Sequence, residues 1–420
     1  MPRLSAPRGT ADILPGESWK WQAVEGIARD LAERYHFQEI RTPIYEHTEL
    51  FHRGVGETTD IVRKETFTFR PRPESESITL RPEGTAGVVR AVIEHGLIAQ
   101  EGARVKVYYL GPNFRYERPQ KGRLRQHHQF GAEIFGIAQP EADVECILLQ
   151  MDFYRACGVK DLELQVNSLG DSASKQQYRD RLRKFLSPRA ARLSEDSQRR
   201  LSENPLRILD SKDPRDIEAT GDVPPAIECL SDSSRRHFEA VQRLLRQSGV
   251  PFTVNRRLVR GFDYYTDTLW EVVAGRLGAQ NALGGGGRYD NLVETLGGRP
   301  TPGVGFGSGI ERLLLALEGQ GAQLPRRDRP LVWLVAHGDA ARSALWKIQQ
   351  QLREAGFPAD MDYTGRSVKA QFKMADREGA RWCVVIGENE LASGTVILKD
   401  LSTGQQTTTP QGELLKHLSA

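Results

Sequence analysis

The sequence predicts a protein of mixed helices and strands, with a large sheet domain that carries a helical insertion and a smaller α/β domain after it. Strand-like segments with alternating faces lie on both sides of a charged, helix-patterned stretch at about 171–246. A polar segment rich in Gly and Pro at 317–330 predicts a linker. Strands and helices then alternate through 331–420, which is typical of a compact α/β domain with a partly parallel sheet.

The bulk composition excludes several classes of protein. A length of 420 residues allows more than one domain with ample core. The 58 Lys and Arg residues nearly balance the 55 Asp and Glu residues, so the net charge of the chain does not by itself indicate a polyanionic binding partner. No apolar run has the length of a signal peptide or a membrane span. The scattered cysteines show neither C-x-x-C nor zinc spacing, at Cys146, Cys157, Cys229 and Cys383. We therefore expect a cytoplasmic protein with reduced thiols, no membrane contact and no tightly bound metal.

The large domain is expected to begin with a helix capped by Ser18 and ending near Tyr35, because apolar residues recur there at helical spacing. Short extended segments are expected next, at 38–44, 65–69 and 77–80. They are followed by a helix over 85–94, a β-hairpin over 105–136, a helix at about 141–157 and a strand at 162–168. After the insertion, the sheet pattern resumes at Pro251, with a strand, a glycine turn and an apolar helix in turn.

The smaller domain is expected to open with a buried strand, LVWLVA, followed by a helix at about 340–355. The extended segment PADMDY and a helix near 367–378 come next, and two further strands close the predicted set, WCVVIG and TVILKD.

The hairpin over 105–136 places ionic groups on a face that should be buried. Since successive strand residues point to opposite faces, Arg115 shares a face with Glu117 on the first arm. The matching face of the return arm holds an amide, a gap and a carboxylate, at Gln129, Gly131 and Glu133. Uncompensated buried charge is costly, so a ligand with phosphate and polar groups is expected on this face. Gly131 would leave the space for it, and a basic loop at 118–123 would reach toward it.

The glycine-rich segments do not match the usual nucleotide-binding fingerprints. The chain has no G-x-x-x-x-G-K-[ST], and the alternating glycines of 303–309 break G-x-G-x-x-G at Ser308 and Ile310. A nucleotide would therefore be held by arginines. Arg260 and Arg312 are flanked by glycines that allow a ligand to approach, although surface salt bridges are the commoner role of an arginine.

Other polar positions leave alternatives open. Tyr264 and Tyr265 are either core aromatics or part of a site, since Asp263 beside them is polar for a plain core strand. At the start of the helix over 85–94, Thr85 is the simplest cap, and Glu83 accepts a hydrogen bond either locally or from a ligand.

A basic stripe follows one face of the helix near 367–378, at Lys369, Lys373 and Arg377. It is either a solvated face or a contact for a nucleic-acid backbone.

Four segments together resemble the histidyl-tRNA synthetases, which are class II aminoacyl-tRNA synthetases: FRYERPQKGRLRQHHQFGAEIFG, LVRGFDYYT, ALGGGGRYDNL and GVGFGSGIERL. The resemblance covers essentially the whole chain. It implies an α+β fold, with a catalytic domain over 1–325 on a mainly antiparallel six-stranded sheet and an anticodon-binding α/β domain over 331–420. It also implies a homodimer, with FQEIRTPIYE similar to the class II interface motif.

The resemblance further implies attachment of histidine to its tRNA through a histidyl-adenylate, with ATP as substrate and Mg²⁺ on its phosphates. Arg115 would hold the ATP α-phosphate, and Arg260 would support it from the histidine side as a second catalytic residue. Glu117, Arg123 and Arg312 would complete the ATP site. The histidine pocket would comprise Glu83, Thr85, Arg115, Gln129, Glu133, Arg260, Tyr264 and Tyr265. The chain departs from the family pattern at Phe262 and His127.

Two other classes of function compete with this interpretation. The histidine-sensing regulatory subunit of ATP phosphoribosyltransferase resembles the catalytic domain, but it typically lacks the C-terminal domain and parts of the arginine set. A pure tRNA-binding module would not explain the many ligand-type residues of the hairpin and glycine segments.

Overall fold

The computed structural model describes residues 4–56, 59–120, 122–275, 282–325 and 330–419. Contacts between residues divide the chain into two compact units, Met1–Pro325 and Arg326–Ala420. Among the described residues, no helix combines the length and apolar character that a membrane crossing requires.

Unit 1 is built on one sheet of eight strands in the order β1-β5-β6-β11-β10-β9-β7-β8. The strands are β1 (Gln38–Glu39), β5 (Val105–Phe114), β6 (Gln126–Phe135), β7 (Leu162–Ser168), β8 (Phe252–Val254), β9 (Thr266–Ala274), β10 (Ala282–Arg288) and β11 (Gly303–Gly309). Only the short edge strands β1 and β8 pair in parallel with their neighbours. The α+β class is confirmed, and the two short edge strands extend the expected six-stranded sheet to eight. The glycine segment expected to form a turn is instead strand β10, which pairs with β11.

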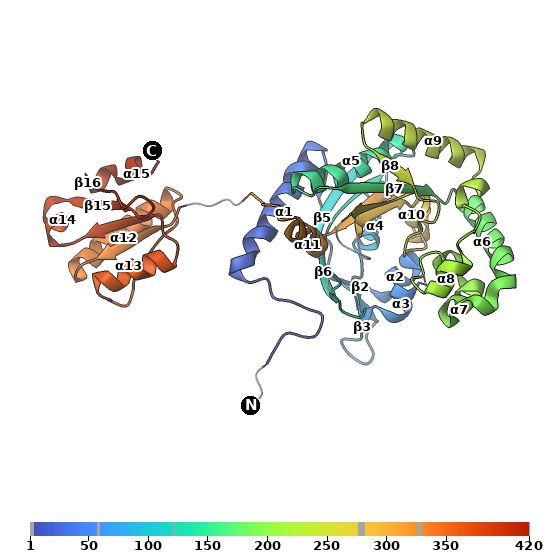
Figure 1. Ribbon diagram of the computed structural model, residues 1–420, viewed down its shortest axis with the longest axis horizontal. Coiled ribbons are helices and arrows are strands. Elements are labelled where there is room, and N and C mark those ends of the chain that lie inside the picture. The colour runs from blue at the N-terminus through green and yellow to red at the C-terminus, as the bar shows by residue number, and fades with distance from the viewer. Residues whose placement is uncertain (1–3, 57–58, 121, 276–281, 326–329, 420) are drawn as a thin grey trace. The chain divides into compact units, whose positions relative to one another are not determined.

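One face of this sheet is covered by four helices, α1 (Pro15–Arg34), α5 (Pro140–Ala156), α9 (Asp232–Gln247) and α11 (Ile310–Gln320). Figure 1 shows α5 and α9 running along this side of the sheet. Their buried residues form one continuous apolar core with strands β6, β7, β9 and β11. The first helix begins at Pro15 rather than after Ser18, because proline presets the helical φ and its missing N–H is not needed in the first turn.

The opposite face of the sheet carries shorter elements and remains partly open. They are α2 (Thr48–Val55), α3 (Asp60–Lys64), α4 (Thr85–Glu94) and α10 (Leu292–Thr295). A small sheet in the order β2-β4-β3 lies near them, with β2 (Tyr45–His47), β3 (Phe67–Phe69) and β4 (Ile78–Leu80). The apolar side of α4 packs against the sheet through Val88, Val89 and Val92.

Helices dominate the region between β7 and β8. It contains α6 (Ser172–Leu186), α7 (Glu195–Glu203) and α8 (Pro214–Ala219), joined by 3₁₀ turns at Ser187–Arg192, Pro205–Ile208 and Ala226–Cys229. These elements share a small core of their own, and Asp171 and Ser194 cap α6 and α7 through their side chains. The last helix of the region, α9, packs instead against α5 on the large sheet.

Unit 2 has a five-stranded sheet in the order β13-β12-β14-β15-β16. Its strands are β12 (Val332–Ala336), β13 (Ala359–Met361), β14 (Trp382–Ile386), β15 (Thr395–Asp400) and β16 (Gln406–Pro410), and its helices are α12 (Asp339–Glu354), α13 (Val368–Arg377), α14 (Glu388–Ser393) and α15 (Leu414–Ser419). The central strand β12 pairs in parallel with β13 and β14, so the sheet is partly parallel as the alternating pattern predicts.

Candidate active site

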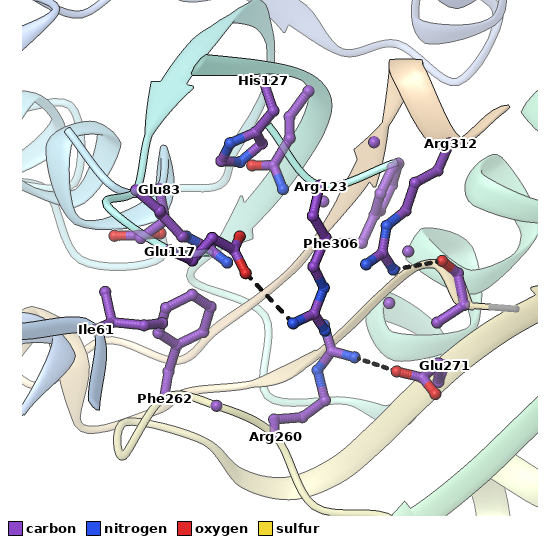
Figure 2. Close-up of a pocket in the computed structure, with 18 of the residues that line it drawn as sticks. Ile61, Glu83, Glu117, Arg123, His127, Arg260, Phe262, Glu271, Phe306 and Arg312 are labelled. Atoms are coloured by element: carbon purple, nitrogen blue, oxygen red, sulfur yellow. Dashed lines mark hydrogen bonds and ion pairs between the residues drawn. The ribbon is translucent and has the colours of Figure 1, made fainter. Parts of the chain in front are cut away.

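The open face of the large sheet holds a cavity of about 360 Å³. Its walls come from the β5–β6 hairpin, the glycine strands β10 and β11, and the segment that runs from Val259 to Tyr265. Figure 2 shows three arginine side chains reaching into it from different elements, Arg123, Arg260 and Arg312. Polar and charged side chains therefore converge here from parts of the sequence that lie far apart.

The register of the hairpin brings its polar positions onto the cavity side. Gly111 pairs with Gln129 and Asn113 with His127, and beyond the strand the Arg115 amide donates to the Arg125 carbonyl at 2.8 Å. Arg115 and Gln129 consequently line the same cavity.

Glu133 lies two positions along the same face from Gly131, but its side chain is fully buried and does not line the cavity. It lies behind Thr85 and Tyr109, whose hydroxyl groups both donate to its carboxylate. Any influence of Glu133 on a ligand therefore passes through these two hydroxyl groups.

The space over Gly131 is not vacant, which corrects the expectation that substrates lie there. The ring of Tyr109 covers Gly131 so closely that a β-carbon would overlap it, and Gly84 meets the same ring. The two glycines form a slot that seats Tyr109 on the cavity wall. Tyr109 is a site residue that the sequence did not reveal, because an aromatic residue in a strand is most often part of the core.

Each arginine is anchored by groups of the protein. Arg115 Nε donates to the Pro82 carbonyl at 2.8 Å, and Arg312 donates to the carbonyls of Gly122 at 3.2 Å and Ala282 at 2.8 Å. Because carbonyl anchors do not neutralise a guanidinium charge, both arginines keep a full positive charge beside the cavity.

Two further arginines of the cavity have carboxylate partners. Arg260 pairs with Glu271 at 2.9 Å and Arg123 with Glu117 at 3.3 Å, as Figure 2 shows. Arg260 Nε is buried without a hydrogen-bond partner among the described residues, so a donor remains for a ligand. Glu271 was not recognised from the sequence, although it is an acidic position in the otherwise apolar second half of β9.

The electrostatic environment of the cavity shifts several pKa values. Burial lowers the pKa of His127 to about 3, with Arg115 acting in the same direction, so the imidazole is neutral at physiological pH. Burial, and then the nearby Glu117, raise the pKa of Glu65. Burial, followed by Arg123, lowers the pKa of Arg312.

The start of α4 shows which local hydrogen bonds Glu83 and Thr85 make. Glu83 accepts hydrogen bonds from the amides of Thr85 at 2.7 Å and Ala86 at 2.8 Å, so it satisfies the first turn of the helix. The expectation that Thr85 caps the helix is wrong, because its hydroxyl group donates to Glu133 at 2.8 Å. Burial raises the pKa of Glu83, and both Glu83 and Thr85 line the cavity.

Glu133 is surrounded by hydroxyl donors. Thr85 donates to Oε1 at 2.8 Å, Tyr109 to Oε1 at 3.2 Å and Tyr289 to Oε2 at 2.5 Å. Burial raises the pKa of Glu133 to about 8 even though the three hydrogen bonds act in the opposite direction. The carboxyl group thus sits close to a change of protonation near neutral pH.

The remaining wall is aromatic. Tyr264 and Tyr265 both line the cavity, and Tyr264 stacks on Phe262 with the ring centroids 5.2 Å apart. The two tyrosines are therefore buried aromatics and cavity-wall residues at once. Their neighbour Phe262 also carries the guanidinium of Arg115 at 5.6 Å from its ring centre.

The two basic segments of the sequence lie in different parts of the structure, one at the cavity of unit 1 and one in unit 2. Gly122 and Arg123 of the loop at 118–123 line the cavity, whereas Lys121 lies outside the described residues. The basic stripe of unit 2 is exposed along α13, at Lys369, Lys373 and Arg377. The opposite side of that helix packs against the sheet of unit 2 through Phe372 and Ala375.

Comparison with known proteins gives a consistent result over the whole chain. The family model described as histidyl-tRNA synthetase matches residues 9–313, and the anticodon binding domain model matches residues 331–420. The histidine–tRNA ligase of Thermosynechococcus vestitus is 51% identical over 412 residues, which cover 98% of this chain and 95% of the relative. The histidine–tRNA ligase of Pelotomaculum thermopropionicum is 50% identical, with 98% and 96% covered. The apo crystal structure of S. aureus histidyl-tRNA synthetase aligns with a TM-score of 0.84 at 38% identity and covers 100% of both chains.

Proposed function

This chain belongs to the histidyl-tRNA synthetase family and joins histidine to tRNA, and we propose that it does so in the cavity of unit 1 through a histidyl-adenylate made from ATP. The observation that carries this proposal is the convergence of Arg115, Arg260 and Arg312 on one cavity. Three guanidinium groups from separate segments of the chain match the charge of a triphosphate, and two of them are anchored mainly by neutral carbonyl groups.

The first step is nucleophilic substitution at phosphorus. A carboxylate oxygen of histidine attacks the α-phosphorus of ATP, the bond to the bridging oxygen breaks, and diphosphate leaves with the electron pair. We assign Arg115 and Arg260 to the oxygens of the α-phosphate, where negative charge develops. Because their positions are set by Pro82 and Glu271, little reorganisation is needed during the reaction.

The remaining groups of ATP are assigned to the other charged residues of the cavity. We assign Arg312 to the γ-phosphate, Arg123 to the phosphates beside it, and Glu117 to the amino group of adenine. The ion pair between Arg123 and Glu117 would open as ATP enters, since each partner then gains a group of the nucleotide.

Mg²⁺ would enter with the ATP phosphates rather than reside on the protein. In the part of the chain that the structure describes, no group of three or more His, Cys, Asp or Glu side chains is arranged to hold a metal ion. Glu271 holds Arg260 through Oε1, and its other carboxylate oxygen on the cavity wall is a ligand of the kind that Mg²⁺ prefers.

Histidine would lie beside the hairpin and the aromatic wall. An imidazole presents one donor and one acceptor, and the amide of Gln129 with the hydroxyl groups of Tyr264 and Tyr265 can answer both. Glu83 would pair with a cationic group of the amino acid. Thr85 would contact the substrate while Glu133 orients its hydroxyl group from behind. An apolar analogue would leave these buried groups unpaired, which disfavours its binding strongly.

In the second step a hydroxyl group of the terminal adenosine of tRNA attacks the carbonyl carbon of the adenylate, and AMP leaves. We propose that the tRNA also contacts unit 2, through the α13 residues Lys369, Lys373 and Arg377. The match of residues 331–420 to an anticodon binding domain supports this assignment.

We further propose a homodimer that acts in the cytoplasm. Large apolar side chains are exposed on the small sheet and just before it, with Ile44 at 45%, Tyr45 at 56% and Phe69 at 46%. Ile44 and Tyr45 belong to FQEIRTPIYE, the segment similar to the class II interface motif. The four cysteines are buried as free thiols, which is compatible with a reducing compartment.

A histidine-dependent exchange of labelled diphosphate into ATP tests the proposed reaction. The purified chain should catalyse it with histidine and not with other amino acids. A folded protein that binds histidine but supports no exchange would favour the alternative, a histidine-sensing regulatory subunit. That alternative is opposed by the complete arginine set and by the match of unit 2 to an anticodon binding domain.

A further inference from the structure

A second cavity lies on the other side of Tyr264, where the helical region of unit 1 meets the core. Its volume is about 390 Å³, and Tyr264 lines both this cavity and the active-site cavity. Its walls come from α2, from the first two turns of α6, from the segment 263–266 and from α10 with the residue before it. No step of the proposed reaction uses this cavity.

The lining of the second cavity is cationic. Arg53, Lys175 and Arg179 face a single carboxylate, Asp263. One oxygen of that carboxylate already accepts a hydrogen bond from Asn204 at 2.7 Å. Arg53 also forms an ion pair with Glu49, which is not part of the cavity wall. The cavity therefore carries an excess of positive charge.

Arg179 gives the clearest sign that a group of opposite charge belongs here. Its Nε is buried, and among the described residues it has no hydrogen-bond partner. A buried donor left unsatisfied costs about 1–3 kcal/mol, and more when it is charged. The side chain belongs to α6, a helix of 15 residues that is capped by Asp171 and is therefore well defined in direction.

Lys175, one turn earlier on α6, is held in place at the inner end of the cavity. Its Nζ donates to the carbonyl of Asp263 at 2.5 Å and to the carbonyl of Tyr265 at 2.9 Å. These bonds satisfy two of its three N–H groups without neutralising its charge. Burial lowers the pKa of Lys175 to about 8, and the nearby Arg179 acts in the same direction, so two like charges share this space.

We propose that this second cavity is an anion site that binds a phosphate group between Lys175 and Arg179. A halide cannot make the two parallel hydrogen bonds that a guanidinium group offers to a pair of oxygens. A phosphate fits better than a single carboxylate, because its additional oxygens and higher charge can engage Lys175 while two oxygens bind Arg179. Ser172, Asn291 and Thr295 add neutral polar side chains to the wall. Two sources offer this chemistry, a backbone phosphate of the tRNA and a small free phosphate compound.

The test compares Arg179→Gln with Lys184→Gln. The control removes one positive charge from the same helix at an exposed position outside the cavity. The first measurement is the rise in melting temperature caused by inorganic phosphate, and the second is the Kd for the histidine tRNA as a function of salt concentration. Neither measurement depends on the residue assignments made for the active-site cavity. A negative result therefore counts against the anion site and leaves the proposed reaction untouched.

Inorganic phosphate should raise the melting temperature of the wild type and of Lys184→Gln, and most of that rise should be lost in Arg179→Gln. The Kd of Arg179→Gln for tRNA is measured in the same way. If it also increases roughly tenfold, and the slope of log K against log salt falls by about one unit, the bound group is a tRNA phosphate. If only the response to inorganic phosphate is lost, the site takes a small phosphate compound. A wild type that does not respond to phosphate, or an Arg179→Gln variant that responds as the wild type does, would overturn the proposal.

Discussion

Arg260 combines an acidic anchor with a donor that has no partner among the described residues. Glu271 holds one side of the guanidinium at 2.9 Å, and Nε is buried without a partner among the described residues. A group oriented in this way stabilises charge that develops in the transition state without reorganising during the reaction.

Replacing Arg260 with Ala should slow adenylate formation by roughly 10²–10³-fold, as expected for the loss of one preorganised donor. The rate is measured as the pre-steady-state formation of histidyl-adenylate in a single turnover. Arg256→Ala is the matched control, because Arg256 is an exposed arginine four residues earlier that does not line the cavity. A folded Arg260→Ala protein that forms the adenylate at the wild-type rate would remove Arg260 from the mechanism.

Glu133 ties the stability of the protein to pH. Its pKa of about 8 in the folded protein lies above the ordinary value of 4.5, mainly because the carboxyl group is buried. The folded state therefore holds this proton more tightly than the unfolded chain does. The resulting stability is fully present below pH 4.5 and is lost as the pH rises through about 8, at about 1.4 kcal/mol for each unit of the shift.

Glu133→Gln should therefore lose less stability than the wild type between pH 5 and pH 8, because glutamine does not titrate. The free energy of unfolding, measured by urea denaturation at several pH values, gives the two slopes. Glu141→Gln, an exposed substitution on α5, should keep the wild-type slope. Equal slopes for Glu133→Gln and the wild type would contradict the raised pKa.

For single residues, the sequence is informative where the alternation of faces along a strand alone determines which side chains reach the cavity. Arg115 and Gln129 reach the cavity because strand residues two apart share a face. The sequence is less informative where a contact between residues far apart in the chain determines the role of a side chain. Thr85 could not be recognised as a partner of Glu133, because the two residues lie 48 positions apart in the chain and meet only through packing.

In the β5–β6 hairpin, a residue without a side chain makes room for an aromatic ring on the cavity wall. Tyr109 of β5 lies across Gly131 of β6 on one side and meets Gly84, just before α4, on the other. The ring fits in this position only because both neighbours lack a β-carbon. The hydroxyl group of Tyr109 then reaches Glu133 at 3.2 Å.

Gly131→Ala should push Tyr109 from this position, because the new methyl group would occupy the space of its ring. We expect a loss of about 1–3 kcal/mol in the free energy of unfolding, as for overpacking of a core, together with a higher KM for histidine. The control is Gly26→Ala in α1, where a β-carbon meets no atom within 4 Å and alanine favours the helix by roughly 1 kcal/mol. A Gly131→Ala variant with unchanged stability and KM would show that the slot is not required.

Most helices and strands were predictable because apolar periodicity marks one buried face. The helix expected over 85–94 is α4, and the two arms of the hairpin are β5 and β6. The edge strand β16 was missed because four of its five residues are exposed and the sequence QTTTP shows no alternation of apolar and polar residues. A strand at the edge of a sheet buries only one side, so its sequence shows only a weak apolar pattern.

At the scale of the whole molecule, unit 2 offers an exposed basic surface on helix α13. Its sheet is closed by an apolar core on one side and by Ala375 and Phe372 of α13 on the other, which leaves the basic stripe of α13 exposed. Lys369 and Lys373 make no ion pair among the described residues, whereas Arg377 pairs with Glu378 at 2.8 Å. Unpaired exposed cations on one helix face are suited to a phosphate backbone, although a solvated surface would look the same in isolation.

Neutralising Lys369 and Lys373 together by substitution with Gln decides between these two interpretations. If the stripe binds tRNA, the Kd for tRNA should rise and the slope of log K against log salt should fall by about one unit for each lost phosphate contact. Histidine-dependent diphosphate exchange should stay unchanged, because it requires no tRNA. The control is Lys347→Gln with Lys416→Gln, two exposed lysines on α12 and α15. If both double variants bind tRNA with the same affinity and salt dependence as the wild type, the stripe is a solvated face and the tRNA contacts of unit 2 lie elsewhere.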